Sequence, residues 1–170
     1  MVFTFDTVYD QRAVTAMARG LRKTIRKKRS RRSHLFGWLV IGLGLLLTLR
    51  NPIVVDGRTI ITWGTGVFLL AALLFEDRLN AFFARRRMMT GTDRAVATFT
   101  ETGYFSETAA GRTEWRYENI AHIAQDDEYF IFVFDQRYAQ VYAKAGLAGG
   151  TVEDFCVFIS QVTGKEVAKI

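Results

Sequence analysis

The sequence that decides the fold is LFGWLVIGLGLLLTL at residues 35–49, followed after a short polar stretch by TIITWGTGVFLLAALLF at residues 59–75. Neither run contains a charged side chain. As α-helices they would measure roughly 23 and 26 Å at 1.5 Å per residue, close to the ~30 Å of a bilayer core. The residues between them, RNPIVVDGR, supply turn chemistry through Asn51-Pro52 and Asp56-Gly57. This pattern predicts a two-helix transmembrane hairpin, and the alternative is a buried helical hairpin in a soluble domain.

Charge is divided unequally along the 170 residues. Residues 1–92 hold 16 Lys and Arg against 5 Asp and Glu, whereas residues 93–170 hold 7 against 12. No acidic residue occurs between Asp10 and Asp56. Positive residues next to a span indicate its cytoplasmic side, so the pattern predicts a multi-pass protein of the cell inner membrane with both termini in the cytoplasm.

The basic residues are candidates for contact with anionic lipid, because each cation near such a surface contributes about 1 kcal/mol. A nucleic-acid arm and a protein docking site are the alternatives, and nucleic acid is not expected. The candidate lipid contacts are Arg19, Arg22, Lys23, Arg26, Lys27, Lys28, Arg29, Arg31, Arg32, Arg85, Arg86 and Arg87.

The rest of the chain predicts a small β-domain. Met1–Asp6 alternates like a strand, and Thr7–Arg32 has apolar residues at helical spacing. Six strand-like segments follow between residues 96 and 143, at the spacing typical of an antiparallel meander in a sandwich or barrel. A helix capped by Thr151 and ended by Gly164 follows them. We expect Phe3 and Phe5 to join the sheet as a seventh strand. We also expect the basic helix, residues 12–32, to pack on Tyr129–Phe134, and the alternative is the same helix lying flat on the anionic leaflet with its apolar face down.

Four regions follow from this division. Residues 1–33 form a strand and a basic amphipathic helix, 34–76 the hairpin, 77–92 a helical extension, and 93–170 the β-domain. The expected fold class is therefore an α+β membrane protein, in which a transmembrane hairpin carries a small antiparallel barrel or sandwich capped by a C-terminal helix.

No residue pattern indicates an enzyme, a metal site or a cofactor. His122 lies between apolar neighbours, Asp126-Asp127-Glu128 is typical of a hairpin turn, and Cys156 lies beside the apolar stripe of the last helix. Two functions stay open: a non-catalytic scaffold that presents the β-domain to a protein partner, and a lipid-binding or membrane-sensing module. The sequence leaves the oligomeric state open and includes a homo-oligomer among the alternatives.

The order of elements resembles one protein family. Trp115, then Ile120 and Ile123, an acidic turn, the aromatic strand Tyr129–Phe134, and a helix with Phe155 and Phe158 resemble the YcxB-like family of bacterial membrane proteins. The resemblance implies two membrane spans and a C-terminal domain similar to bacterial pleckstrin-homology domains. It implies no reaction. The chain departs from the family at Ala143–Leu147, where relatives tend to carry a proline and a bulky aromatic residue.

Overall fold

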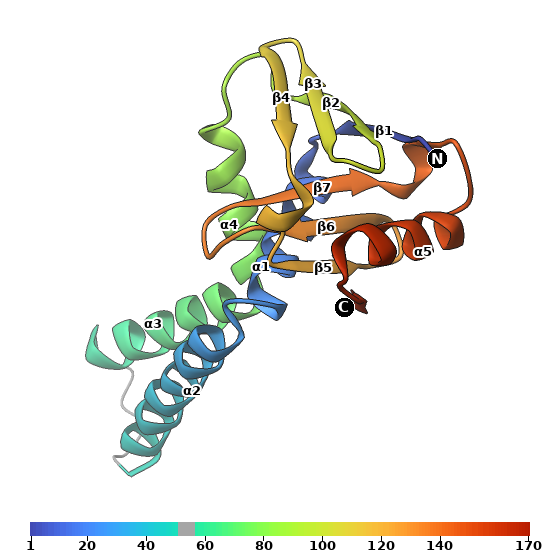
Figure 1. Cartoon of the computed structure of the whole chain (residues 1–170). Helices are drawn as coiled ribbons and strands as arrows, with labels where there is room; N and C mark the ends of the chain where they lie inside the picture. Colours follow the sequence, from blue (N-terminus) through green and yellow to red (C-terminus); the bar gives the residue numbers. More distant parts are fainter. Residues whose placement is uncertain (51–56) are drawn as a thin grey trace.

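The computed structural model describes residues 1–50 and 57–170, apart from the side chains of Arg29, Thr48, Leu49, Arg50 and Arg58. Within these residues the chain has a mixed α/β fold with two sheets and five helices. Figure 1 shows a two-sheet body from which a pair of helices projects. The predicted bend at Asn51–Asp56 lies outside the described residues.

A five-stranded antiparallel sheet forms one layer of the body, in the order β4-β3-β2-β1-β8. Its strands are β1 (Phe3–Val8), β2 (Arg94–Phe99), β3 (Tyr104–Thr108), β4 (Gly111–Trp115) and β8 (Leu147–Ala148). In the β1–β2 pair, Phe3 lies opposite Phe99 and Phe5 opposite Ala97. The prediction that the N-terminal strand joins the C-terminal domain is therefore confirmed.

The second layer is a four-stranded sheet in the order β7-β6-β5-β9. It contains β5 (His122–Gln125), β6 (Tyr129–Val133), β7 (Ala139–Ala143) and β9 (Val167–Lys169). β9 pairs with β5 in parallel, so this sheet is mixed rather than purely antiparallel. The sequence analysis found the other three strands of this sheet, but neither β9 nor the two-residue β8 of the first sheet.

An aromatic core fills the space between the sheets. Phe3, Phe5, Phe99, Phe130 and Phe132 are all fully buried there. Helix α5 (Val152–Thr163) adds Phe155, Phe158 and Ile159 to the same cluster. Thr151 and Asp154 form a capping box at its start, and Gly164 ends it in the left-handed conformation, so this helix prediction is confirmed.

Helix α1 (Gln11–Lys23) covers the opposite face of the second sheet. Ala13, Ala16 and Leu21 pack there against Ile131 and Val133 of β6, together with Ala124, Ala139 and Val141. A Cβ atom at Gly20 would lie 2.6 Å from Cγ2 of Ile131, so the helix approaches this strand as closely as a glycine allows. The predicted docking of this helix on Tyr129–Phe134 is confirmed.

The remaining helices lie outside the two sheets. They are α2 (Lys27–Arg50), α3 (Gly57–Leu74) and α4 (Glu76–Arg86). Helices α2 and α3 pack on each other and project from the body as a helical arm, whereas α4 turns back along α1 (Figure 1). The single helix predicted over Thr7–Arg32 is wrong, because α1 ends at Lys23 and α2 begins at Lys27.

The prediction of a transmembrane hairpin is also wrong. In the part of the chain that the structure describes, no single helix has both the length and the apolar composition needed to cross a membrane. Helix α2 begins with the basic segment KKRSRR. Helix α3 gives way to α4 at a 75° bend. Thr59–Leu74 and Glu76–Arg86 have the length and apolar composition of a membrane span only when they are taken together as a bent pair. The expected fold class, an α+β membrane protein, is therefore wrong, and the described residues have a mixed α/β fold instead. The expected multi-pass inner-membrane location with cytoplasmic termini is contradicted by the same finding.

The position of Phe5 leads to a stability prediction. Its ring contacts those of Phe99, Phe130, Tyr142 and Phe155, and none of it is exposed. We expect Phe5→Ala to lower the free energy of unfolding by about 3–5 kcal/mol, because it leaves a cavity between the sheets. Urea unfolding followed by circular dichroism measures this loss. Val2→Ala, at a residue that is 56% exposed, is the control and should change stability by less than ~0.5 kcal/mol. Equal effects of the two variants would contradict the placement of β1 in the core.

Candidate functional site

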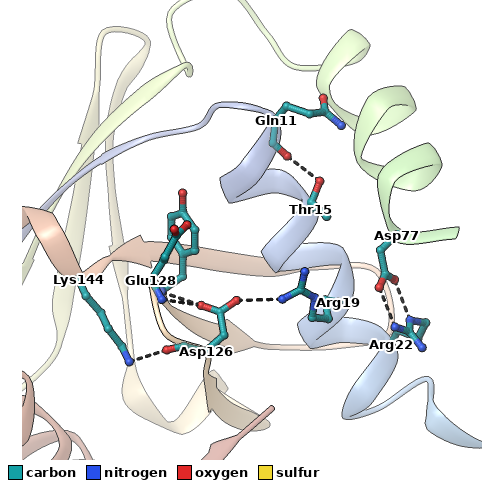
Figure 2. Close-up of polar contacts among 9 residues, drawn as sticks. Gln11, Thr15, Arg19, Arg22, Asp77, Asp126, Glu128 and Lys144 are labelled. Atoms are coloured by element: carbon teal, nitrogen blue, oxygen red, sulfur yellow. Dashed lines mark hydrogen bonds and ion pairs between the residues drawn. The ribbon is translucent and has the colours of Figure 1, made fainter. Parts of the chain in front are cut away.

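The basic residues singled out from the sequence fall into two groups. In the first group the side chain contacts a carboxylate or a backbone carbonyl, and in the second no ion pair with a described acidic residue is formed. The partnered group is centred on α1. Arg19 lies 3.5 Å from the Asp126 carboxylate, Arg22 pairs with Asp77, and Nε of Arg26 donates to the backbone oxygen of Gln136 at 2.6 Å. Figure 2 shows Arg19 and Arg22 turned toward their carboxylates on the β5–β6 turn and on α4. These residues position α1 within the protein.

The Arg22–Asp77 contact is the closest of these ion pairs. Nε and Nη2 of Arg22 donate to the two carboxylate oxygens of Asp77 at 2.7 Å each. The hydrogen-bonded carboxylate raises the pKa of Arg22, more than partial burial lowers it. The sequence analysis did not predict this pair, because the two residues are 55 positions apart. The fold brings them together by laying α4 on α1, where Ala81 is fully buried.

Asp126 organises the turn that Arg19 contacts. Its Oδ1 accepts hydrogen bonds from the backbone N–H groups of Glu128 and Tyr129, at 3.0 and 2.8 Å. The turn joins the antiparallel strands β5 and β6, so the predicted hairpin turn is confirmed. No group of three or more His, Cys, Asp or Glu side chains in the described part of the chain could hold a metal ion.

The second group of cations lies at the base of the helical arm. Lys27, Lys28, Arg31 and Arg32 are exposed on the first turns of α2, and we call these four residues the basic collar. Within residues 1–50 and 57–170, no ion pair joins any of them to an acidic group. Lys23 is likewise exposed at the end of α1. The side chain of Arg29 lies outside the description.

Arg85, Arg86 and Arg87 belong to another part of the chain than the collar, because α3 lies between α2 and α4. They lie at the far end of the 11-residue α4, roughly 16 Å from its start at the arm. All three are exposed, and the guanidinium carbon of Arg86 lies 4.4 Å from the centre of the Phe82 ring. The exposed candidate lipid contacts are therefore divided between the start of α2, with the neighbouring Lys23, and the end of α4.

Beyond the collar, the arm exposes a large apolar surface. Leu35, Phe36 and Leu39 are 71%, 68% and 54% exposed, and Ile61 and Phe68 on α3 are 71% and 72% exposed. Many exposed apolar side chains on one pair of packed helices indicate an interaction site. The arm places it directly beyond the collar, because Leu35 follows Arg32 by one helical turn.

Two tyrosines and the cysteine are engaged in packing, whereas His122 is exposed on β5. Tyr104 and Tyr142 both donate to Oε1 of Gln140, and burial raises the pKa of both hydroxyl groups. Cys156 packs against the aromatic core, and burial raises the pKa of its thiol. Groups that hold their protons in this way are poor bases and nucleophiles.

The ion pairs of α1 lead to a prediction about their relative strength. A double-mutant cycle of Arg22→Gln and Asp77→Asn should give a coupling energy of about 1–2 kcal/mol, because the contact is bidentate and partly shielded from water. The matched cycle of Arg19→Gln and Asp126→Asn should give about 0–1 kcal/mol, since Arg19 is 42% exposed and 3.5 Å away. Urea unfolding of both sets measures the two energies. A larger coupling for Arg19–Asp126 would contradict this ranking.

Comparison of the chain with protein-family models, curated proteins and solved structures gave no match. The resemblance to the YcxB-like family therefore stays a prediction from the sequence. The geometry of the site carries the functional argument that follows.

Proposed function

We propose that this chain is a non-catalytic binding module whose basic collar contacts an anionic lipid surface. The observation that carries the proposal is the position of four exposed cations, without an ion pair among the described residues, directly before the exposed apolar surface of the arm. The two features need different surroundings, since the cations are stabilised by phosphate and the apolar side chains by hydrocarbon. The boundary of a lipid layer provides both within a few ångströms.

The proposed contact is interfacial. The collar lies among the head groups and the apolar side chains of α2 and α3 lie against the outer part of the acyl layer, with no helix crossing it. Trp38 and Trp63, which are 53% and 50% exposed on the arm, have the amphipathic side chains that favour this boundary.

The charge of the body supports the same orientation. Residues 93–170, which form most of the two sheets, carry 12 acidic against 7 basic residues and are repelled by lipid phosphate. The apolar face of α1 is covered by β6 and β7, so α1 cannot lie on lipid with that face down. The collar and the arm are therefore the part of the chain suited to the contact.

A protein partner is the second candidate, and the edge of the first sheet favours it. β4 ends that sheet, and four of its five residues, Gly111–Glu114, are exposed. An edge strand of this kind can pair with an extended segment of another protein through its backbone. In this scaffold function the body presents β4 to the partner.

Neutralising the collar tests the lipid proposal. Replacement of Lys27, Lys28, Arg31 and Arg32 by Gln should weaken binding to vesicles that contain an anionic phospholipid by two to three orders of magnitude, because each cation contributes about 1 kcal/mol. Vesicle co-flotation of the full chain over a lipid titration measures the affinity. Binding of the unmodified chain should also weaken as salt is added.

The matched control replaces Arg112, Arg116, Lys165 and Lys169 by Gln, which removes the same charge from the body. This control should bind anionic vesicles as the unmodified chain does. Equal binding by the collar variant and the unmodified chain would refute the lipid proposal. A protein partner retained by the unmodified chain but lost when Thr113→Pro blocks the β4 edge would favour the scaffold function.

A further inference from the structure

Two grooves on the body meet along α1 and α4. The first, of about 620 Å³, follows α4 from Glu76 to Arg87. The second, of about 520 Å³, leads on from Met88 to the inner side of β3 and β4. Val14, Met17 and Ala84 line both, so the two grooves adjoin at these residues.

The first groove carries cations. Arg26, Arg87 and Arg137 line it, together with Arg22, whose charge is matched by Asp77. Its acidic residue, Glu76, is engaged by His34 at 2.8 Å. Nearby, the Asp135 carboxylate accepts from the backbone N–H groups of Arg137 and Tyr138. Two guanidinium groups, those of Arg87 and Arg137, make no ion pair with an acidic group in the described part of the chain.

The second groove is mainly apolar. Met88 and Met89 line it from the segment after α4, and Trp115 and Tyr138 line it from the body, with their rings stacked 5.5 Å apart. Methionine side chains adapt to ligands of varied shape and are common at binding surfaces. Trp115 Nε1 is also the one buried side-chain nitrogen or oxygen without a hydrogen-bond partner in the described residues.

From this arrangement we propose that the adjoining grooves bind a single-chain anionic amphiphile. Its carboxylate or phosphate head lies between Arg87 and Arg137, and its acyl chain runs past Met17 to Trp115. Arginine forms paired hydrogen bonds with both kinds of head group. Each groove alone falls in the range of roughly 300–1,000 Å³ that small-molecule sites occupy, and the two together slightly exceed it.

None of the four collar residues lines this site, although Ser30 and Ser33 of the same helix do. The proposal does not rest on the proposed contact with a lipid surface. The site takes a monomer from solution, whereas the collar needs an extended layer. The experiment therefore uses dissolved amphiphile below its micelle concentration and no vesicles, so that the two proposals can fail independently.

Trp115 provides the readout. In the full chain with Trp38→Phe and Trp63→Phe, Trp115 is the remaining tryptophan of the three, and both replaced residues are at least half exposed, so the fold should persist. Dodecanoate brominated near its chain end should quench the Trp115 fluorescence saturably. Removing one methylene from the chain should raise Kd about fourfold, as expected for chain burial.

Three variants of this background locate the ligand. Arg87→Gln with Arg137→Gln should raise Kd at least tenfold, because charge-assisted hydrogen bonds to the head are lost. Ala84→Phe should abolish quenching by filling the point where the grooves adjoin. The matched controls, Arg116→Gln with Lys169→Gln and the exposed Ala168→Phe, should leave Kd unchanged. Circular dichroism confirms that each variant is folded.

Several results would overturn the proposal. One is that brominated dodecanoate does not quench Trp115 in the folded Trp38→Phe, Trp63→Phe chain. This holds even if it quenches the unmodified chain, because that quenching would then come from Trp38 and Trp63. Another is equal quenching by brominated dodecanol together with an unchanged Kd in the Arg87/Arg137 variant, because the ligand would then be selected by its chain alone.

Discussion

The structure depends on the need to cover both faces of β6. Its alternate residues face opposite sides: Phe130 and Phe132 enter the aromatic core between the sheets, and Ile131 and Val133 face α1. In a sandwich of only two sheets, each sheet has one face in water, so a strand that is apolar on both faces needs a third layer to cover its outer face. Helix α1 is that third layer. It can approach closely because Gly20 faces Ile131 without a side chain.

This constraint also explains why the body is built from distant parts of the chain. β1 precedes α1 and pairs with β2, which lies almost 90 residues later. The buried Thr7 side chain accepts from the backbone N–H of Ala143 and so ties β1 to β7 of the other sheet. With β1 fixed in one sheet and α1 packed on the other, the chain enters α2 at a defined point. The helical arm therefore has a fixed origin on the body.

Periodicity predicted most of the body from the sequence, because its strands alternate and α5 has both of its caps in the sequence. Alternation also identified Phe3 and Phe5 as core residues, and the apolar character of Tyr129–Phe134 on both faces predicted the docking of α1. β8 and β9 were missed because two or three residues carry no periodic signal, and their pairing depends on neighbours that only the fold supplies.

The transmembrane interpretation failed because composition does not show where helices begin and bend, as at Lys27 and Phe75. Among the candidate contacts, charge alone could not separate Arg22, which pairs with Asp77, from Lys27, which has no ion pair in the described part of the chain.

The groove follows from the way α4 is held against α1. Ala81 is buried at the crossing, and the Arg22–Asp77 pair fixes the start of α4 on the same side of α1. Past this crossing Ala84 is only half-buried, so small side chains leave space between α4 and the sheet where larger ones would fill it. Val14 and Met17 form a wall of that space while their neighbours Ala13 and Ala16 pack on β6 and β7. The helix that completes the core therefore also shapes the groove, so a change that loosens α1 should affect stability and ligand binding together, whereas a change at Arg87 or Arg137 should affect binding alone.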